Sequence, residues 1–240
     1  MDETGFRIGI GKDQLIVTKR NRTHLFSMPE NRESATAIEA ISAGGKYLPA
    51  FLILSSQVDM SNWYIQPELD DATVITLSPT GYSNDENSLA WIQHFDKHSK
   101  MYGKKRLLIL DGHGSHHTLE FIKYCDDHDI NPFAMPPHLT HILQPLDVAV
   151  FQPLKHYHGK ALDLMVRDGV TNITKLEFLS LFQQIRKQAF KRSTIHSAFK
   201  KTGIYPLNPQ LVIEVLAARA PVRHLHQCHL GILLQTSQRL

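Results

Sequence analysis

Three aspartates stand in contexts where a carboxylate could take part in chemistry. Asp2 opens the first strand-like segment, and Asp111 directly follows the apolar run Arg106–Leu110. Asp147 lies in the sequence QPLD, where a helix is expected to begin, and 35 residues separate it from Asp111. Carboxylates offer hard oxygen ligands, which suit Mg²⁺ or Mn²⁺. The three side chains are therefore candidate ligands of a two-metal site.

Two such ions about 4 Å apart can activate a nucleophile and stabilise the leaving oxygen of a phosphodiester. An Asp-Gly step after a strand is, however, also a common turn, and a carboxylate at a helix N-terminus is favourable without any catalytic role. From residue type and spacing alone, the catalytic and the purely structural interpretations both stay open.

The hydrophobic pattern predicts the elements that must position these aspartates. Strands are expected over 6–18 (as a hairpin), 35–43, 47–55, 74–77, 106–110 and 131–135, and helices over 84–100, 116–127, from 145, from 174 and over 195–201. Strands first, then strand–helix alternation, then helices indicate a mixed α/β fold. Asp111 would lie at the carboxyl end of a central strand, where α/β sheets place ligands.

Two further sequence features concern helix ends. Thr174 and Glu177 have the spacing of a capping box, and so do Ser83 and Glu86. Pro153 follows the expected helix start at Pro145 and should kink or restart that helix, because proline lacks the backbone N–H that an interior position needs.

Histidines three residues apart raise the question of a zinc site. The pairs are His113/His116 and His138/His141. Structural zinc sites combine His with Cys, and the two cysteines of the chain lie away from both pairs in sequence, so the pattern disfavours zinc. The glycine-rich stretches match neither a P-loop nor the elbow of serine hydrolases.

The charge is divided unevenly along the 240 residues. Residues 1–150 carry a net charge of −6 and residues 151–240 a net charge of +9. A basic C-terminal part suggests a polyanionic partner, and a solvated helix surface explains it equally well. Three basic pairs are candidate phosphate contacts: Arg186-Lys187, Lys191-Arg192 and Lys200-Lys201.

Composition excludes two other classes of protein. No apolar run approaches the roughly 20 residues of a membrane-spanning helix, and the first residues do not have the pattern of a signal peptide. Two cysteines are too few for a disulfide framework, which favours a reducing compartment.

Two long strings resemble the DDE endonuclease domain of pogo-type transposases, the group that includes Tigger, jerky, Fot-like and centromere-protein-B relatives. These strings are LDGHGSHHTLEFIKYC from Leu110 and MPPHLTHILQPLDVAVFQPLK from Met135. MDETGF at the start is similar to the family's first catalytic motif, and TGIYPLNP (Thr202–Pro209) to its C-terminal signature. The resemblance runs from residue 1 to about residue 210.

The resemblance implies an RNase H-like fold, with a five-stranded mixed sheet flanked by helices and a helical C-terminal part. Asp2, Asp111 and Asp147 match the family's catalytic and metal-binding positions one by one. The implied cofactor is a pair of Mg²⁺ or Mn²⁺ ions, and the implied reaction is hydrolysis of a DNA phosphodiester followed by strand transfer. His113, His141 and Gln144 are expected to hydrogen-bond a metal-bound carboxylate or to contact DNA.

The domain expected from this resemblance covers residues 1–210, and residues 211–240 are expected to form a basic, poorly defined tail. The expected partners are DNA and further copies of the chain on that DNA, in the nucleus, with no membrane and no small-molecule cofactor. Relative to the family, the start of the first strand and an upstream helix-turn-helix region are missing. Asp2 would therefore lie beside the positive amino group of Met1, which could compete with a metal.

Two hypotheses about function follow. The first is a metal-dependent endonuclease domain derived from a transposase, inactive if the shortened first strand disables it. The second is a non-catalytic nucleic-acid-binding remnant, or a domesticated DNA-binding protein, that keeps the fold without turnover.

Overall fold

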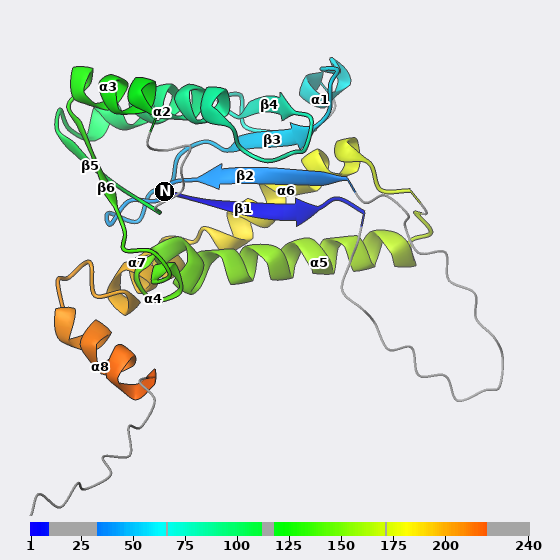
Figure 1. The fold of residues 1–240 in the computed structure, drawn as a ribbon. Helices are drawn as coiled ribbons and strands as arrows, with labels where there is room; N and C mark the ends of the chain where they lie inside the picture. The colour runs from blue at the N-terminus through cyan, green and yellow to red at the C-terminus, as the bar shows by residue number, and fades with distance from the viewer. Residues whose placement is uncertain (10–32, 66, 112–117, 171, 220–240) are drawn as a thin grey trace, which may run out of the picture.

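The computed structural model describes residues 1–9, 33–65, 67–111, 118–170 and 172–219 (Figure 1). Its strands are β1 (Asp2–Arg7), β2 (Ser34–Glu39), β3 (Phe51–Ser55), β4 (Val74–Ser78), β5 (Arg106–Leu110) and β6 (Ile130–Ala134). Its α-helices are α1 (Asn62–Ile65), α2 (Asp85–Ser99), α3 (Leu119–Asp127), α4 (Thr140–Leu143), α5 (Phe151–Arg167), α6 (Lys175–Ala189), α7 (Arg192–Lys201) and α8 (Pro209–Arg219). A 3₁₀ turn, η1 (Lys100–Tyr102), follows α2, and a π-helical turn, η3 (Leu146–Val150), precedes α5.

The described strands form two sheets. Strands β1 to β4 lie in sequence order, with β1–β2 and β2–β3 antiparallel and β3–β4 parallel. Strands β5 and β6 form a parallel pair. The amino group of Met1 donates a hydrogen bond of 2.6 Å to the carbonyl oxygen of Ile109, which joins β5 to the start of β1. The described residues therefore form six strands in two sheets rather than one sheet of five strands, and the hydrogen bond of Met1 links the two sheets.

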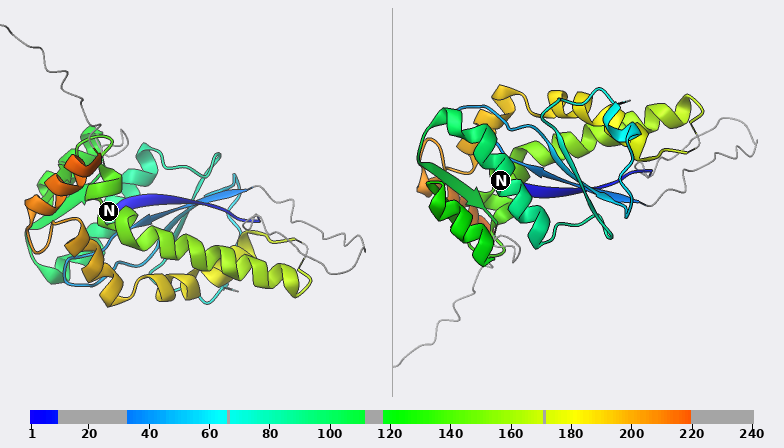
Figure 2. Two further views of the ribbon diagram at one scale, coloured as in Figure 1. Left: turned by 90° about the horizontal axis from the view of Figure 1, so that it is seen from below. Right: turned by 90° about the horizontal axis from the view of Figure 1, so that it is seen from above.

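Helices cover both faces of the larger sheet (Figures 1 and 2). Side chains alternate between faces along each strand. Leu52 of β3 accordingly packs with Phe6 against α5, α6 and α7, whereas Phe51 and Ile53 pack with Trp91 against α2 and α3. The two apolar cores hold the sheet between two helical layers, as the mixed α/β expectation requires.

The predicted helix starts are confirmed in part. The capping box at Thr174 and Glu177 is formed and begins α6. Trp91 and Phe95 are core residues of α2 whose rings stack with centroids 5.5 Å apart. The N-cap of α2, however, is Asn84 rather than Ser83, because the Asn84 side chain accepts the hydrogen bond from the Asn87 backbone. Most of the predicted 6–18 hairpin lies outside the described residues, and the described partner of β1 is β2.

The C-terminal part differs from the expected tail. Helix α8 covers residues 209–219, so the first part of the segment assigned to the tail is helical. Residues 220–240 lie outside the described residues. Among the described helices, none combines the length and apolar character needed to cross a membrane.

A buried ion pair fastens α6 to the sheet. The Arg186 guanidinium donates to both carboxylate oxygens of Glu39, at 2.7 Å and 2.6 Å, and also to the Leu48 carbonyl at 2.6 Å. The two charged side chains are 2% and 0% exposed. Arg186 is therefore unavailable as a phosphate contact, which corrects the expectation for that basic pair. Local sequence could not reveal this, since the partner lies on a distant strand.

Removing one member of this pair is expected to be more harmful than removing both. Arg186→Met leaves a buried carboxylate without its partner and should lower the free energy of unfolding by about 3–5 kcal/mol. Glu39→Leu combined with Arg186→Met should recover most of that loss. Urea unfolding measures both, and Lys187→Met, at the exposed neighbouring position, is the control. Equal losses for Arg186→Met and Lys187→Met would contradict the assignment.

Candidate metal-binding site

Asp2 lies on β1 with its side chain on the face that α5, α6 and α7 cover. The residue is 6% exposed. One carboxylate oxygen, Oδ1, accepts a hydrogen bond of 2.8 Å from the Glu3 backbone, whereas Oδ2 is buried and has no hydrogen-bond partner among the described residues. Glu3 points to the other face, where it accepts a hydrogen bond of 2.7 Å from Ser83. Asp2 therefore presents a buried oxygen that a cation could satisfy.

Asp111 and Asp147 come from two other elements. Asp111 directly follows β5 and is half-buried, and Asp147 is exposed on the π-helical turn η3. The turn is identified by the backbone bond from Phe151 N–H to the Leu146 carbonyl, five residues back. The sequence predicted a helix start here but not the wider turn. Such turns occur often at functional sites.

Electrostatics place the three aspartates in one neighbourhood. Burial, together with the negative charges of Asp147 and Asp111, raises the pKa of Asp2 to about 8. A carboxylate surrounded by like charges in a poorly solvated position resists ionisation. A bound cation would relieve this repulsion, so the arrangement favours positive charge at this end of the sheet.

The Met1 amino group lies within the field of Asp2 and Asp111. Burial lowers its pKa to about 6, although both carboxylates favour its charged form. At neutral pH most of this group is therefore uncharged. It competes with a cation less strongly than its ordinary pKa would suggest.

The remaining expected site residues have different surroundings. Gln144 is buried, and its Nε2 donates a hydrogen bond of 2.8 Å to the Met1 carbonyl, which ties the approach to η3 to the start of β1. The side chain thus contacts the backbone beside Asp2 rather than a carboxylate. His141 is exposed on α4. His113 lies outside the described residues.

The three aspartates are chemically suited to bind divalent cations, but their side chains do not lie close enough together to share one. They are hard donors, and the unsatisfied oxygen of Asp2 is available to a cation. Within the described ranges, no three His, Cys, Asp or Glu side chains are grouped closely enough to bind an ion together. Joint coordination therefore requires side-chain movement, which the exposed Asp147 can provide by changing rotamer.

Zinc is disfavoured by the surroundings of the one described cysteine. Cys125 is buried in the core between α3 and the sheet, and burial raises the pKa of its thiol to about 11. Zinc binds the thiolate, so this change opposes binding. His138 and His141 are both exposed.

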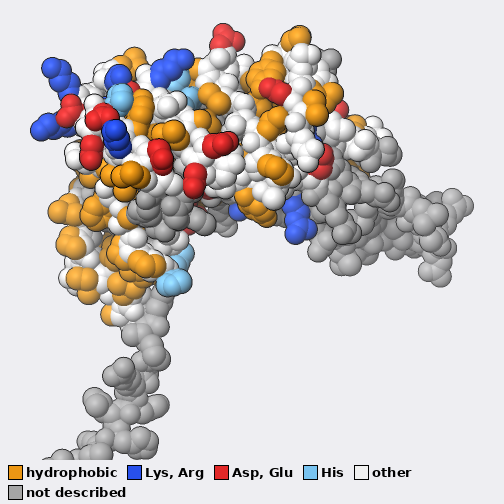
Figure 3. Space-filling view, turned by 45° about the horizontal axis from the view of Figure 1, so that its top comes forward, with side chains coloured by type: hydrophobic (Ala, Val, Ile, Leu, Met, Phe, Trp, Pro, Cys, Tyr) orange, Lys and Arg blue, Asp and Glu red, His pale blue; other side chains and the backbone are white. Residues whose placement is uncertain are grey.

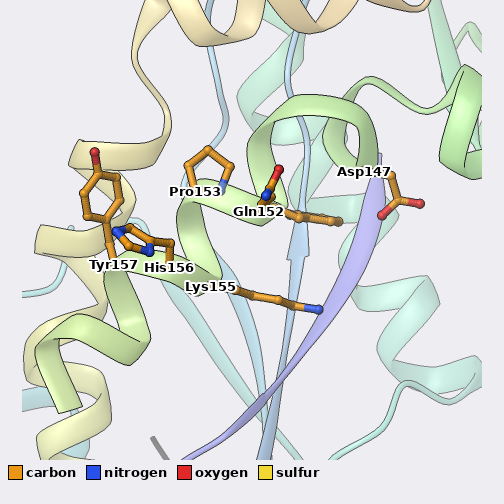
Figure 4. Close-up of a pocket in the computed structure, with 7 residues that line it drawn as sticks. Asp147, Gln152, Pro153, Lys155, His156 and Tyr157 are labelled. Carbon is orange, nitrogen blue, oxygen red and sulfur yellow. The ribbon is translucent and has the colours of Figure 1, made fainter. Parts of the chain in front are cut away.

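An open cavity of about 660 Å³ borders Asp147 (Figure 4). It is lined by Asp147, Phe151, Gln152, Pro153, Lys155, His156 and Tyr157. Most of the lining comes from the first turns of α5, which places two basic side chains beside a candidate metal ligand. The sequence reasoning did not single out Lys155 or His156, although Lys155 ends the long string that starts at Met135.

Asp2→Asn is expected to stabilise the metal-free fold at alkaline pH. Asp2 ionises near 3.8 when unfolded but near 8 when folded, so the unfolded state binds fewer protons between these values and stability falls as pH rises through this window. Asparagine removes the effect. The gain should be a few kcal/mol near pH 8 and vanish near pH 4.

Thermal unfolding in EDTA at both pH values measures this gain. Mg²⁺ at pH 8 should raise the Tm of the wild type and leave that of Asp2→Asn nearly unchanged, because binding to the folded state stabilises it. A variant less stable than the wild type in EDTA at pH 8 would contradict the described environment of Asp2.

Comparison with curated proteins identifies two relatives. The chain is 37% identical over 223 residues to the "MFS-type transporter clz9" of Cochliobolus lunatus, covering 91% of this chain and 24% of that protein. It is 28% identical over 123 residues to the "Pogo transposable element with ZNF domain" of Homo sapiens, covering 50% of this chain and 8% of that protein. The chain therefore spans only a minor part of either relative.

Solved structures with the same fold include the Mos1 strand transfer complex, with a TM-score of 0.53 at 10% identity over 90% of this chain and 52% of the other. They also include the Mos1 transposase paired-end complex with left transposon end, with a TM-score of 0.52 at 9% identity over 90% and 53% of the two chains. These similarities establish an RNase H-like fold.

The model of the DDE superfamily endonuclease family matches residues 19–199. This range contains Asp111 and Asp147 and begins after Asp2. Together with the pogo relative and the shared fold, the match shows that the chain belongs to the DDE superfamily endonucleases and forms a pogo-type domain.

Proposed function

We propose that this domain is a Mg²⁺- or Mn²⁺-dependent endonuclease that cuts a DNA phosphodiester and transfers the cut strand. The observation that carries the proposal is the electrostatic coupling of Asp2 to Asp147 and Asp111 from three separate elements. A bound cation would offset the repulsion between these like charges, so their arrangement favours a cation site.

Asp2, Asp111 and Asp147 would hold the ions. When bound, divalent cations supply Lewis acidity toward the phosphodiester and its attacking oxygen. The chain's own residues fix the geometry. Buried Gln144 holds the Met1 carbonyl and thereby the position of β1 relative to η3. Two apolar cores keep the sheet rigid beneath the aspartates.

Asp111→Asn and Asp147→Asn are each expected to abolish Mg²⁺-dependent nicking of supercoiled plasmid, because an amide oxygen binds the ions far more weakly than a carboxylate. Asp126→Asn, an exposed position on α3, is the matched control and should retain full activity. Undiminished nicking by either purified site variant would refute the metal assignment.

A cysteine substitution at Asp111 distinguishes the loss of a metal ligand from misfolding of the domain. Asp111→Cys should be inactive with Mg²⁺ and regain part of its nicking with Mn²⁺, because sulfur ligands suit softer ions better than Mg²⁺. Failure of Mn²⁺ to restore nicking in a variant with wild-type Tm would count against a ligand role for Asp111.

A second candidate function is DNA binding without turnover. The observation that favours it is that the described His, Cys, Asp and Glu side chains are not already grouped around an ion position. Salt-sensitive DNA binding with no nicking in either Mg²⁺ or Mn²⁺ would select this function over the first.

Assembly and location complete the proposal. Strand transfer joins two DNA segments. We propose that copies of the chain assemble on DNA to carry out this step, and that the protein acts in the nucleus. Sedimentation with and without a DNA duplex tests the assembly, and a fluorescent fusion tests the location.

A further inference from the structure

Two histidines one turn apart on α2 form a pair that the proposed function does not use. His94 and His98 are four residues apart, which places them on the same face of the helix. Their ring centroids lie 4.6 Å apart, and the two ring planes are inclined by 55°. Zinc enzymes hold their metal with two histidines at this spacing on one helix. The pair is therefore a candidate for a second metal site.

The surroundings of His94 leave one of its ring nitrogens ready to bind a metal. Its Nε2 lies 2.9 Å from the carbonyl oxygen of Pro49, in the segment before β3. Because a carbonyl oxygen only accepts, Nε2 carries the proton, and the lone pair of the neutral ring is then on Nδ1. Nδ1 makes no hydrogen bond with the described residues. Metal-bound histidines commonly donate their other N–H to a backbone carbonyl in this way, which fixes the ring for coordination.

Both rings favour the neutral form, which is the form that binds a metal. Burial lowers the pKa of His94, and positive charge on His98 and Lys97 also opposes its protonation. Burial and the charge of Lys97 likewise lower the pKa of His98, although Asp70 acts in the opposite direction. At neutral pH the two imidazoles are therefore mostly uncharged, and an ion has few protons to displace from them.

A carboxylate from another segment lies close enough to act on the pair. Asp70 belongs to the turn before β4, and its charge favours the protonated form of His98. Its Oδ1 accepts a hydrogen bond of 2.9 Å from the Ala72 backbone, whereas its Oδ2 makes no hydrogen bond with the described residues. The three side chains are not grouped around one point in the described part of the chain. Asp70 is exposed, so it can reach an ion by changing rotamer.

The pair is accessible from solvent and differs from the other described histidine pair. His98 is half-buried. In Figure 3 histidine side chains reach the surface of the helical layer that α2 and α3 form, among lysine and acidic side chains. His138 and His141 are exposed, and neither ring has a hydrogen bond with the described residues that would orient it. Two imidazoles and a carboxylate are a ligand set that zinc accepts without a thiolate.

We propose that His94 and His98 bind one Zn²⁺ ion on α2, with Asp70 as the third ligand and a water molecule in the fourth position. The ion would link α2 to the turn before β4. Through the hydrogen bond of His94 to Pro49, it would also hold α2 against the segment that leads into β3. None of these residues belongs to the candidate endonuclease site, so the inference does not depend on the proposed function.

Calorimetric titration of the full chain with Zn²⁺, in excess Mg²⁺, tests the site. The wild type should bind one ion per chain at this site and gain Tm, because the ion binds the folded state. His98→Gln should weaken binding by about tenfold or more, since losing even a residue that only orients a metal ligand costs about 10–100-fold. Asp70→Asn should weaken it to a smaller extent. His196→Gln, at an exposed position on α7, is the matched control and should bind like the wild type.

Absence of Zn²⁺ binding by the wild type would overturn the inference, and so would binding that His98→Gln leaves unchanged. Equal losses in His98→Gln and His196→Gln would overturn it as well, since they would indicate only scattered surface histidines. Asp147→Asn separates this site from the endonuclease proposal. It should bind Zn²⁺ as tightly as the wild type whether or not it nicks DNA, and a loss of Zn²⁺ binding in this variant would place the ion at the aspartates instead.

Long-range ¹H–¹⁵N NMR of the histidine rings tests the assignment on the wild type alone, so it remains decisive if His98→Gln does not fold. In the metal-free chain, His94 should carry its proton on Nε2. Addition of Zn²⁺ should shift the ¹⁵N signal of His94 Nδ1 and one ring nitrogen of His98, because coordination changes the electron density at the bound nitrogen. Shifts confined to other histidines would overturn the assignment.

Discussion

The burial of the Asp2 carboxyl group near the negative charges of Asp147 and Asp111 is the constraint on which the rest of the structure depends. Asp2 is buried, and Asp147 and Asp111 add negative charge around it. A cluster of this kind persists only if the surrounding elements prevent it from separating. Two hydrogen bonds join β5, β1 and the approach to η3 at this point: the Met1 amino group donates to the Ile109 carbonyl, and the Gln144 side chain donates to the Met1 carbonyl.

The neighbouring strand β2 carries a buried carboxylate on the same face of the sheet, and there a cationic side chain pairs with it. Glu39 lies directly across from Asp2 in the β1–β2 register. Arg186 donates a hydrogen bond to each of its carboxylate oxygens. Asp2 has no such partner and keeps an unsatisfied oxygen among the described residues. The two neighbouring buried carboxylates therefore differ in whether a basic side chain hydrogen-bonds them. We interpret the paired Glu39 as structural and the unpaired oxygen of Asp2 as available to a cation.

The sequence predicted those features that depend on local pattern. Short apolar runs located β3, β5 and β6 within a few residues, and the Thr174–Glu177 capping box located the start of α6. Asp111 and Asp147 were identified from motifs in the segments where they stand. Each of these signals lies within a short window, where spacing and side-chain type are sufficient.

Features that depend on contacts between distant segments were not predictable. Arg186 resembled a surface residue because its partner Glu39 is 147 positions away. The division of the described strands into two sheets depends on which distant strands pair, and hydrophobic periodicity does not report that pairing. Helix α8 was not recognised because its apolar residues do not follow a clear one-sided pattern.

The π-helical turn η3 has a consequence for how this domain tolerates changes in length. It accommodates one residue more than an α-helical turn closed by a bond four residues back. Each residue of an α-helix accounts for about 100° of rotation. Deleting one of the three residues between Asp147 and Phe151 would therefore restore regular helix and rotate α5 relative to Asp147. Asp147 and Lys155, which now line one cavity, would then face different directions, although both side chains would still be present.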